Sequence, residues 1–304
     1  MITHKPSEDW FITPNGEARG YIQPHALDEL WIHTGTRCNL ACDFCLEGSG
    51  PDDKRLQPPK FDEVKAHIDE ALNLGVKQFS FTGGEPFLIK DIITILAYAS
   101  QFCPCLVLTN GTDPLLKRLA KLAEISTDNH PISLRISLDY ADAGTHDLAR
   151  GTGNFAKAIV ALKKLHQQGF KVSVARHMAI DEDSAQVEKA FRDLFSLNGL
   201  PEDLPIIAFP DFLPPGAITE VPHITEHCMT HYHNEAQRRQ FMCSNSKMLI
   251  KKNNQLQVVA CTLVDDDDDY VLSDSLSASL DKRISMKHHR CYSCFAYGAS
   301  CSES

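Results

Sequence analysis

Short apolar runs rich in β-branched residues alternate along the chain with stretches in which apolar residues recur every three or four positions. Phe61, Val64, Ile68 and Leu72 follow the second pattern, and Gly75 comes shortly after them. This spacing puts the apolar side chains on one face of a helix, and glycine commonly ends helices. The same reasoning along the chain predicts strands over 30–34, 78–82, 105–109, 132–138, 171–175 and 205–209, and helices over 61–74, 91–101, 114–123, 154–168 and 185–197.

Strands that alternate with helices predict a parallel sheet with right-handed crossover connections. Six such units are fewer than the eight of a closed (β/α)₈ barrel, so we expect an α/β fold of the partial (β/α)6 barrel type. Ligands of such sheets bind where the loops leave the carboxyl ends of the strands. Residues 247–261 predict a β-hairpin that turns at Asn253-Asn254.

The pattern divides the chain into three predicted parts. These are an N-terminal extension over 1–28, the partial barrel over 29–216, and a small cysteine-rich module over 217–304 that contains the hairpin. The chain has 304 residues and a net charge of −10, which argues against a nucleic-acid partner because such proteins present a basic stripe. No apolar run reaches about 18 residues and the N-terminus has no signal-peptide pattern, so we expect no membrane partner and a cytoplasmic location.

The 11 cysteines indicate metal or cluster chemistry, because a reducing compartment disfavours disulfides. Cys38, Cys42 and Cys45 lie on one loop after the first predicted strand. Three thiolates can bind three irons of a [4Fe–4S] cluster and leave the fourth iron open to a small molecule. A structural zinc ion would want a fourth protein ligand. We therefore predict that these three cysteines are metal ligands and form the catalytic centre. The alternative is that their spacing arose by chance.

The Cys-x3-Cys-x2-Cys spacing, with Phe44 before the last cysteine, resembles the signature of radical S-adenosylmethionine (SAM) enzymes. Further segments at predicted strand ends agree with this resemblance, which covers about residues 29–216. They are the GGEP-like segment Thr82-Gly83-Gly84-Glu85-Pro86, the turn Thr109-Asn110-Gly111, Ser137-Leu138-Asp139, Arg150-Gly151-x-Gly153-x-Phe155, and the exit from Pro210 to Gly216.

The resemblance implies roles for individual residues. Cys38, Cys42 and Cys45 would ligate the cluster, whose open iron would take the amino and carboxylate groups of SAM. The expected SAM contacts are backbone at Phe44, Gly83, Gly84 and Glu85, and the side chains of Ser137 and Arg150. Asp139 would either touch substrate or cap the next helix. Reductive cleavage of SAM, with an electron from a flavodoxin or ferredoxin, would yield a carbon radical, usually 5′-deoxyadenosyl.

Four C-terminal cysteines form a second candidate site. Cys243 and Cys261 flank the predicted hairpin, and Cys291 and Cys294 are a Cys-x2-Cys pair, which together suffice for a [4Fe–4S] cluster or a zinc ion. Beside the radical SAM motifs, they resemble the twitch module, a short relative of the SPASM domain, which implies a second, auxiliary [4Fe–4S] cluster. A zinc knuckle is the alternative. Cys228 and Cys301 have no assigned role.

Two polar segments carry weaker signals. His223-Ile224-Thr225-Glu226-His227 matches a zinc-hydrolase pattern, and a helix there would put His223, His227 and His231 on one face. We expect a solvated polar helix, or one that contacts substrate, because the radical SAM motifs are more specific than the zinc-hydrolase pattern. The five aspartates Asp265–Asp269 predict a solvated loop.

The expected function is a radical SAM enzyme that modifies a small biosynthetic molecule, for example by oxidation or by forming a carbon–heteroatom bond. About 28 residues precede the first predicted strand, too few for the N-terminal peptide-binding domain that peptide maturases often carry. The alternative is a maturase of ribosomally made peptides. A non-catalytic iron–sulfur electron carrier is an alternative of another class, and it leaves the SAM-binding motifs unexplained.

Overall fold

A computed structural model of the chain describes residues 7–125, 130–179, 182–210, 217 and 219–298. The described residues form two compact units. The first unit takes its residues from 1–33, 62–77 and 215–304, and the second from 34–61 and 78–214. The predicted domain boundaries after residues 28 and 216 remain a prediction.

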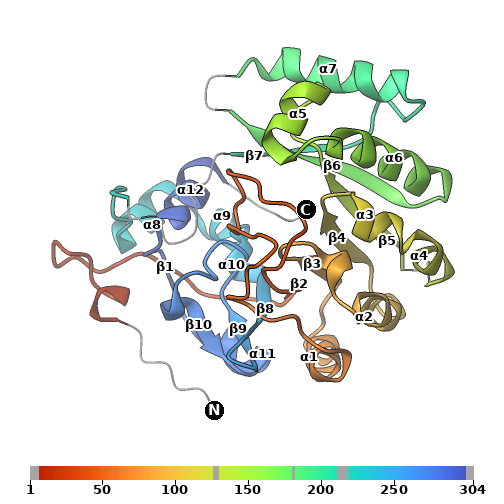
Figure 1. Cartoon of the computed structure of the whole chain (residues 1–304). Coiled ribbons are helices and arrows are strands. Elements are labelled where there is room, and N and C mark those ends of the chain that lie inside the picture. Colours follow the sequence, from red (N-terminus) through yellow and green to blue (C-terminus); the bar gives the residue numbers. More distant parts are fainter. Residues whose placement is uncertain (1–6, 126–129, 180–181, 211–216, 218, 299–304) are drawn as a thin grey trace. The chain divides into compact units, whose positions relative to one another are not determined.

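The second unit is built on five parallel strands in the order β3-β4-β5-β6-β7. The strands are β3 (Gln78–Thr82), β4 (Cys105–Thr109), β5 (Ile132–Ser137), β6 (Lys171–Met178) and β7 (Ile206–Pro210). The helices between them are η2 (Pro86–Leu88), α2 (Ile92–Ala99), α3 (Asp113–Leu116), α4 (Leu119–Ile125), α5 (Ala143–Arg150), α6 (Asn154–Gln167) and α7 (Ser184–Leu197). Figure 1 shows α2, α4 and α6 along the outside of strands β3, β4 and β5. The predicted strand–helix alternation is confirmed.

The core of this unit follows from the apolar runs. Phe79 and Phe81 of β3 and Ile136 of β5 are fully buried, as are Leu162 and Leu165 on the apolar face of α6. Burying such side chains is the main favourable term in folding.

One predicted helix was wrong in detail. The stretch 114–123 is two helices, α3 and α4, because the amide of Arg118 bonds to the carbonyl of Leu115, at 2.8 Å, and tightens the last turn of α3. Leu115 and Leu119 are buried on either side of the break.

The first unit contains a mixed sheet in the order β10-β9-β8-β2. Its strands are β2 (Glu29–His33), β8 (Ser246–Lys252), β9 (Gln255–Val259) and β10 (Val271–Ser273), and β1 (Tyr21–Ile22) pairs separately with β11 (Ile284–Ser285). Its helices are η1 (Glu8–Trp10), α1 (Phe61–Asn73), α8 (Glu226–Tyr232), α9 (Glu235–Arg239), α10 (Met242–Asn245), η3 (Asp268–Tyr270), α11 (Leu276–Leu280) and α12 (His289–Tyr297). No helix among the described residues has the length and apolar character needed to cross a membrane.

The predicted hairpin is confirmed. Strands β8 and β9 pair antiparallel, with Lys252 opposite Gln255. Asn253 and Asn254 between them have φ values of 52° and 60°. Two successive left-handed residues define the type I′ turn that matches the twist of a two-residue hairpin, and asparagine tolerates this conformation well.

Candidate active site

The three N-terminal cysteines lie on the segment that opens the second unit, residues 34–61. The amide of Cys38 donates to the carbonyl of Gly50, at 3.0 Å, which closes the segment into a loop. Within it, the Cys45 amide bonds to the carbonyl of Cys42, at 3.1 Å, and the Gly48 amide bonds to the carbonyl of Cys45, at 2.9 Å. These two consecutive turns hold the cysteines on one short, compact stretch of chain.

The sulfur of Cys38 sits among hydrogen-bond donors. It accepts from the backbone amide of Leu40, at 3.4 Å, and from the side-chain amide of Asn110, at 3.7 Å. Burial raises the pKa of the Cys38 thiol to about 11 and also raises that of Cys42, which the charge of Arg150 partly offsets. Buried thiols of this kind lose their protons when a cation binds them.

The segment after β3 approaches this loop through its backbone. The amide of Gly84 bonds to the carbonyl of Gly35, at 2.9 Å, and the amide of Glu85 to that of Arg37, at 3.1 Å. Gly83 has a φ of +131°, and a Cβ there would lie 2.7 Å from the carbonyl oxygen of Gly35. Only glycine allows both this conformation and this approach.

The Glu85 side chain ties the end of β3 to the end of β4. Its buried carboxylate accepts from the Thr109 hydroxyl, at 2.8 Å, from the Asn110 amide, at 2.9 Å, and from the Phe87 amide, at 3.1 Å. Burial raises the pKa of Glu85 to about 7 despite these donors. The prediction concerned only the backbone of Glu85, so the structure adds a role for the side chain.

Asn110 is a site residue to which the sequence assigned no role. Its side-chain amide donates to the sulfur of Cys38, at 3.7 Å, and to Asn39 Oδ1, at 3.0 Å, and its Oδ1 accepts from the Thr112 hydroxyl, at 2.6 Å. The Thr109-Asn110-Gly111 turn was the available signal. Because the carboxyl ends of parallel strands meet at one edge, a polar residue directly after β4 reaches the loop ahead of β3.

Arg150, at the end of α5, lies against a carboxylate and an aromatic ring. It forms an ion pair with the buried Asp139, and its guanidinium carbon stands 5.3 Å from the centre of the Phe44 ring. Asp139 also accepts from the amide of His177, at 3.1 Å. Of the two roles left open for Asp139, the helix cap is wrong, since Asp142 caps α5 by accepting from the Thr145 amide, at 2.7 Å.

Most of the predicted SAM-site residues are therefore joined by contacts within the second unit. The ends of β3 and β4 hold the cysteine loop through Gly84, Glu85 and Asn110, and Phe44 of that loop touches Arg150. Ser137 is the last residue of β5 and is half-buried. The exit over 211–216 lies outside the described residues.

The four C-terminal cysteines line one cavity of the first unit. Cys243 belongs to α10, Cys261 follows β9, and Cys291 and Cys294 lie one turn apart on α12. Apolar side chains and the fully buried Arg290 complete the walls. Burial raises the pKa of Cys243 to about 12 and that of Cys291 to about 11, so both thiols are protonated until a cation displaces the proton.

Two further buried polar side chains contact this group, and the sequence patterns predicted neither. The hydroxyl of Tyr270 lies 3.6 Å from the sulfur of Cys291 and donates to the carbonyl of Ser285, at 2.8 Å. The ammonium group of Lys247 donates to the carbonyl of Cys243, at 2.8 Å, and burial lowers the pKa of Lys247 to about 8.

Cys228, Cys301 and the histidines of the 223–231 segment were the remaining residues of interest in the sequence. Cys228 lies on α8, where its sulfur accepts from the Thr225 hydroxyl, at 3.3 Å, and Cys301 lies outside the described residues. The sequence predicted that His223, His227 and His231 would share one face of a helix. This prediction is wrong for His223, because α8 begins at Glu226 and His223 lies before it. His227 and His231 are exposed and stacked, as expected for a solvated helix.

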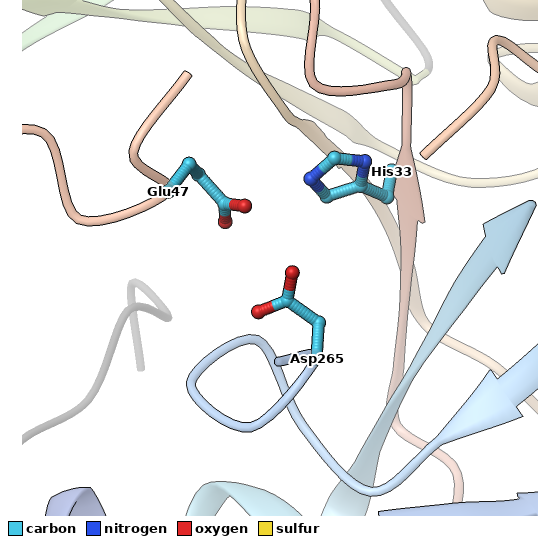
Figure 2. A group of neighbouring side chains, drawn as sticks. All are labelled: His33, Glu47 and Asp265. Carbon is cyan, nitrogen blue, oxygen red and sulfur yellow. The ribbon is translucent and has the colours of Figure 1, made fainter. Parts of the chain in front are cut away.

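The aspartate run is more buried than predicted. Asp266 lies 3.2 Å from the imidazole of His288, and Asp269 forms an ion pair with Lys287, so the predicted solvated loop is only partly solvated. Figure 2 shows the side chains of Asp265, at the start of this run, and of His33, at the end of β2; Glu47, also drawn, belongs to the cysteine loop of the second unit.

Comparison with known proteins gives a family and several relatives. A sequence profile described as the radical SAM superfamily matches residues 32–194. The chain is 35% identical over 166 residues to the antilisterial bacteriocin subtilosin biosynthesis protein AlbA of Bacillus subtilis, a match over 54% of this chain and 35% of AlbA. It is 36% identical over 141 residues to the mycofactocin maturase MftC of Mycolicibacterium smegmatis, over 45% of this chain and 34% of MftC.

The fold resembles that of SuiB from Streptococcus suis. The crystal structure of SuiB bound to S-adenosylmethionine superimposes with a TM-score of 0.59 and 13% identity, over 90% of this chain and 66% of that one. SuiB has also been crystallised with its precursor peptide SuiA. At this identity the likeness shows the fold alone, and the chain spans about a third of the length of the two curated relatives. Since the profile matches more than half of its residues, the chain belongs to the radical SAM superfamily.

Proposed function

We propose that this chain binds a [4Fe–4S] cluster through Cys38, Cys42 and Cys45, cleaves SAM there, and uses the resulting radical to modify a peptide. The observation that best supports the SAM site is the hydrogen bond from the Asn110 side chain to the buried Cys38 sulfur. The backbone amide of Asn110 in turn donates to the carboxylate of Glu85. These contacts join the cysteine loop to the ends of two neighbouring strands. Family membership implies the same cofactors, a [4Fe–4S] cluster and SAM.

The residues present fit these cofactors. Three thiols on one loop, with backbone and side-chain N–H groups already directed at the Cys38 sulfur, are a donor set for iron. When bound there, a reduced cluster supplies the electron that breaks a carbon–sulfur bond of SAM and yields a carbon radical, most commonly 5′-deoxyadenosyl. The protein's contribution is to hold SAM and substrate together and to keep water away from the radical.

The SAM-binding residues divide by the group they meet. The amides of Gly84 and Glu85 already donate within the chain, so backbone carbonyls of Gly83 and Gly84 are the acceptors we propose for the amino group of SAM. Arg150 supplies a positive charge for the carboxylate group of SAM, and Asp139 holds the guanidinium group in place through an ion pair. We assign the adenine to backbone at Phe44 and the ribose to Ser137.

We further propose an auxiliary [4Fe–4S] cluster on Cys243, Cys261, Cys291 and Cys294. The shared cavity and the nearby positive charges of Arg290 and Lys247 support an anionic metal–thiolate group there. A zinc ion would use the same four ligands, and metal analysis separates the two. The electron donor we propose is a flavodoxin or a ferredoxin.

The relatives favour a peptide substrate over the small molecule expected from the sequence. AlbA is a bacteriocin biosynthesis protein and MftC is a maturase, and each is more than a third identical to this chain over the matched segment. SuiB, similar in fold, binds a precursor peptide. We therefore propose the peptide-maturase alternative as the function.

The proposal is tested by iron and sulfide analysis after anaerobic reconstitution, together with 5′-deoxyadenosine formation from SAM under reductant. We expect about eight irons in the wild type and about four in the Cys38→Ala/Cys42→Ala/Cys45→Ala variant, which makes no 5′-deoxyadenosine. Cys103→Ala, which removes a buried thiol outside both groups, is the matched control and keeps both properties. SAM cleavage by the triple variant would contradict the proposed site.

The substrate class is tested separately. Reduced enzyme and SAM are incubated with a pool of synthetic peptides or with a pool of small metabolites, and 5′-deoxyadenosine formation is compared with that of SAM alone. We expect the peptide pool to raise turnover and to contain products of changed mass. Stimulation by the metabolites alone would return the assignment to a small-molecule substrate.

A further inference from the structure

Lys247 lies fully buried in the first unit, next to one of the four C-terminal cysteines. It is the second residue of β8, directly after the helix α10 that carries Cys243. Its ammonium group donates to the carbonyl oxygens of Cys243 and Ser246, each at 2.8 Å. These contacts hold the ammonium group against the backbone of Cys243, a residue that lines the cavity.

The partners of this ammonium group carry no net charge. Among the described residues, no carboxylate lies within ion-pair distance of Lys247, whereas Lys251 of the same strand pairs with Glu63, at 2.7 Å. The two carbonyl oxygens accept hydrogen bonds from the ammonium group, yet they do not neutralise its charge. A buried charge without a counter-charge costs free energy, so a protein that keeps one needs a compensating anion.

The four cysteines supply that anion when they bind a metal group. Four thiolates carry more negative charge than a zinc ion or a [4Fe–4S] core provides in positive charge, so the loaded site is an anion. In a buried site, where charges are weakly screened, a fixed cation lowers the energy of that anion. One-electron reduction makes a cluster more negative still, and the same cation then stabilises the reduced form more than the oxidised form.

We propose that Lys247 is a positioning residue for the auxiliary cluster, whose buried charge compensates the four thiolates and keeps the reduction potential of the cluster high. The inference rests on the proposed auxiliary cluster. The reduction potentials of iron–sulfur clusters depend on the net charge around them and on hydrogen bonds in their surroundings. Lys247 therefore affects how readily the cluster accepts an electron without itself being a ligand.

The test uses the full chain in the Cys38→Ala/Cys42→Ala/Cys45→Ala background, which removes the proposed SAM-site cluster and leaves the proposed C-terminal cluster. Lys247→Met, Lys247→Gln and Lys247→Arg are reconstituted anaerobically, iron is measured, and the midpoint potential is determined by redox titration followed by electron paramagnetic resonance. Lys251→Met, which removes the paired buried ammonium group of the same strand, is the control.

We expect Lys247→Met and Lys247→Gln to shift the midpoint to more negative potential, and Lys247→Arg and Lys251→Met to stay at the parent value. Loss of iron from both neutral variants but not from Lys247→Arg also supports a charge role. An unchanged midpoint in the neutral variants, or iron loss from Lys247→Arg as well, overturns the inference. A parent without iron refutes the auxiliary cluster itself, and the inference with it, before any potential is measured.

Discussion

Asn110 joins the cysteine loop to the end of β4 through a single side chain. Its amide group contacts the sulfur of Cys38 and the oxygen of Asn39, and its oxygen accepts from Thr112. An amide is suited to this position because it donates and accepts at once. The residue therefore acts on the proposed cluster site without being a ligand.

Asn110→Ala is expected to lower cluster occupancy after reconstitution and to cost about 1–3 kcal/mol of unfolding free energy, since buried partners lose their hydrogen bonds. Iron content and denaturant unfolding measure the two effects. Asn198→Ala, which removes a side-chain bond to Leu194 at the end of α7, is the control that loses stability but keeps its iron. Full iron content in Asn110→Ala would show that the sulfur contact is dispensable.

Glu85 makes the stability of the metal-free protein depend on pH. Burial raises the pKa of Glu85 from 4.5 in the unfolded chain to about 7 in the folded one, so between these values the folded state binds more protons. The contribution of Glu85 to the free energy of unfolding is therefore largest below about pH 4.5, and it falls as the pH rises to about 7. Glu85→Gln has no proton to lose, and urea unfolding at pH 5 and pH 7 should show a smaller decrease than in the wild type.

At the scale of elements, the exit of β3 and the cysteine loop are held together by backbone contact. The amides of Gly84 and Glu85 donate to carbonyls at 35 and 37, as an added strand would. A Cβ on Gly84 would overlap the backbone of Arg37, and backbone, unlike a flexible side chain, cannot move aside cheaply. The glycines thus set how close the proposed SAM-binding backbone comes to the cysteine loop.

Gly84→Ala is therefore expected to separate the two segments and weaken SAM binding at least tenfold, which is about 1.4 kcal/mol. Equilibrium dialysis with reconstituted protein measures it. Gly144→Ala, where a Cβ would meet nothing nearer than Asp142 at 3.4 Å, is the control and should bind SAM as the wild type does. Equal affinity in both variants would show that the close approach is not needed.

At the scale of the whole molecule, the two cysteine groups belong to different units of the same chain. Burial raises the pKa of Cys38 in one group and of Cys243 in the other, so these thiols give up their protons only when a cation binds. A metal group that binds the folded state then stabilises it by mass action. Loaded protein should resist unfolding more than metal-free protein.

Thermal unfolding of the reconstituted chain is expected to begin at higher temperature than after iron removal by chelation under oxidation. The Cys38→Ala/Cys42→Ala/Cys45→Ala variant should keep only part of the difference, because the C-terminal group still binds. Anaerobic calorimetry of the four samples, variant and wild type with and without iron, measures this. An equal midpoint for loaded and metal-free wild type would contradict a folding-coupled cluster.

The sequence alone determined the strand–helix alternation, the hairpin with its turn at Asn253-Asn254 and the family, because each depends on residues close together in the chain. Periodicity predicts α6, two asparagines predict the turn at 253–254, and three cysteines within eight residues identify the loop. The sequence patterns did not determine the substrate class. They favoured a small molecule, whereas the peptide substrate is a proposal that rests on the relatives.

Only the tertiary structure decided which distant side chains meet. It brought Asn110 to Cys38 and Arg150 to Asp139 and Phe44, and it buried Lys247 beside Cys243. Local pattern does not encode such contacts, since they depend on how neighbouring strands align at one edge of a sheet and on which side chains that alignment buries. The same reason explains why part of the aspartate run is buried among partners, although like charges in a row predict a solvated loop.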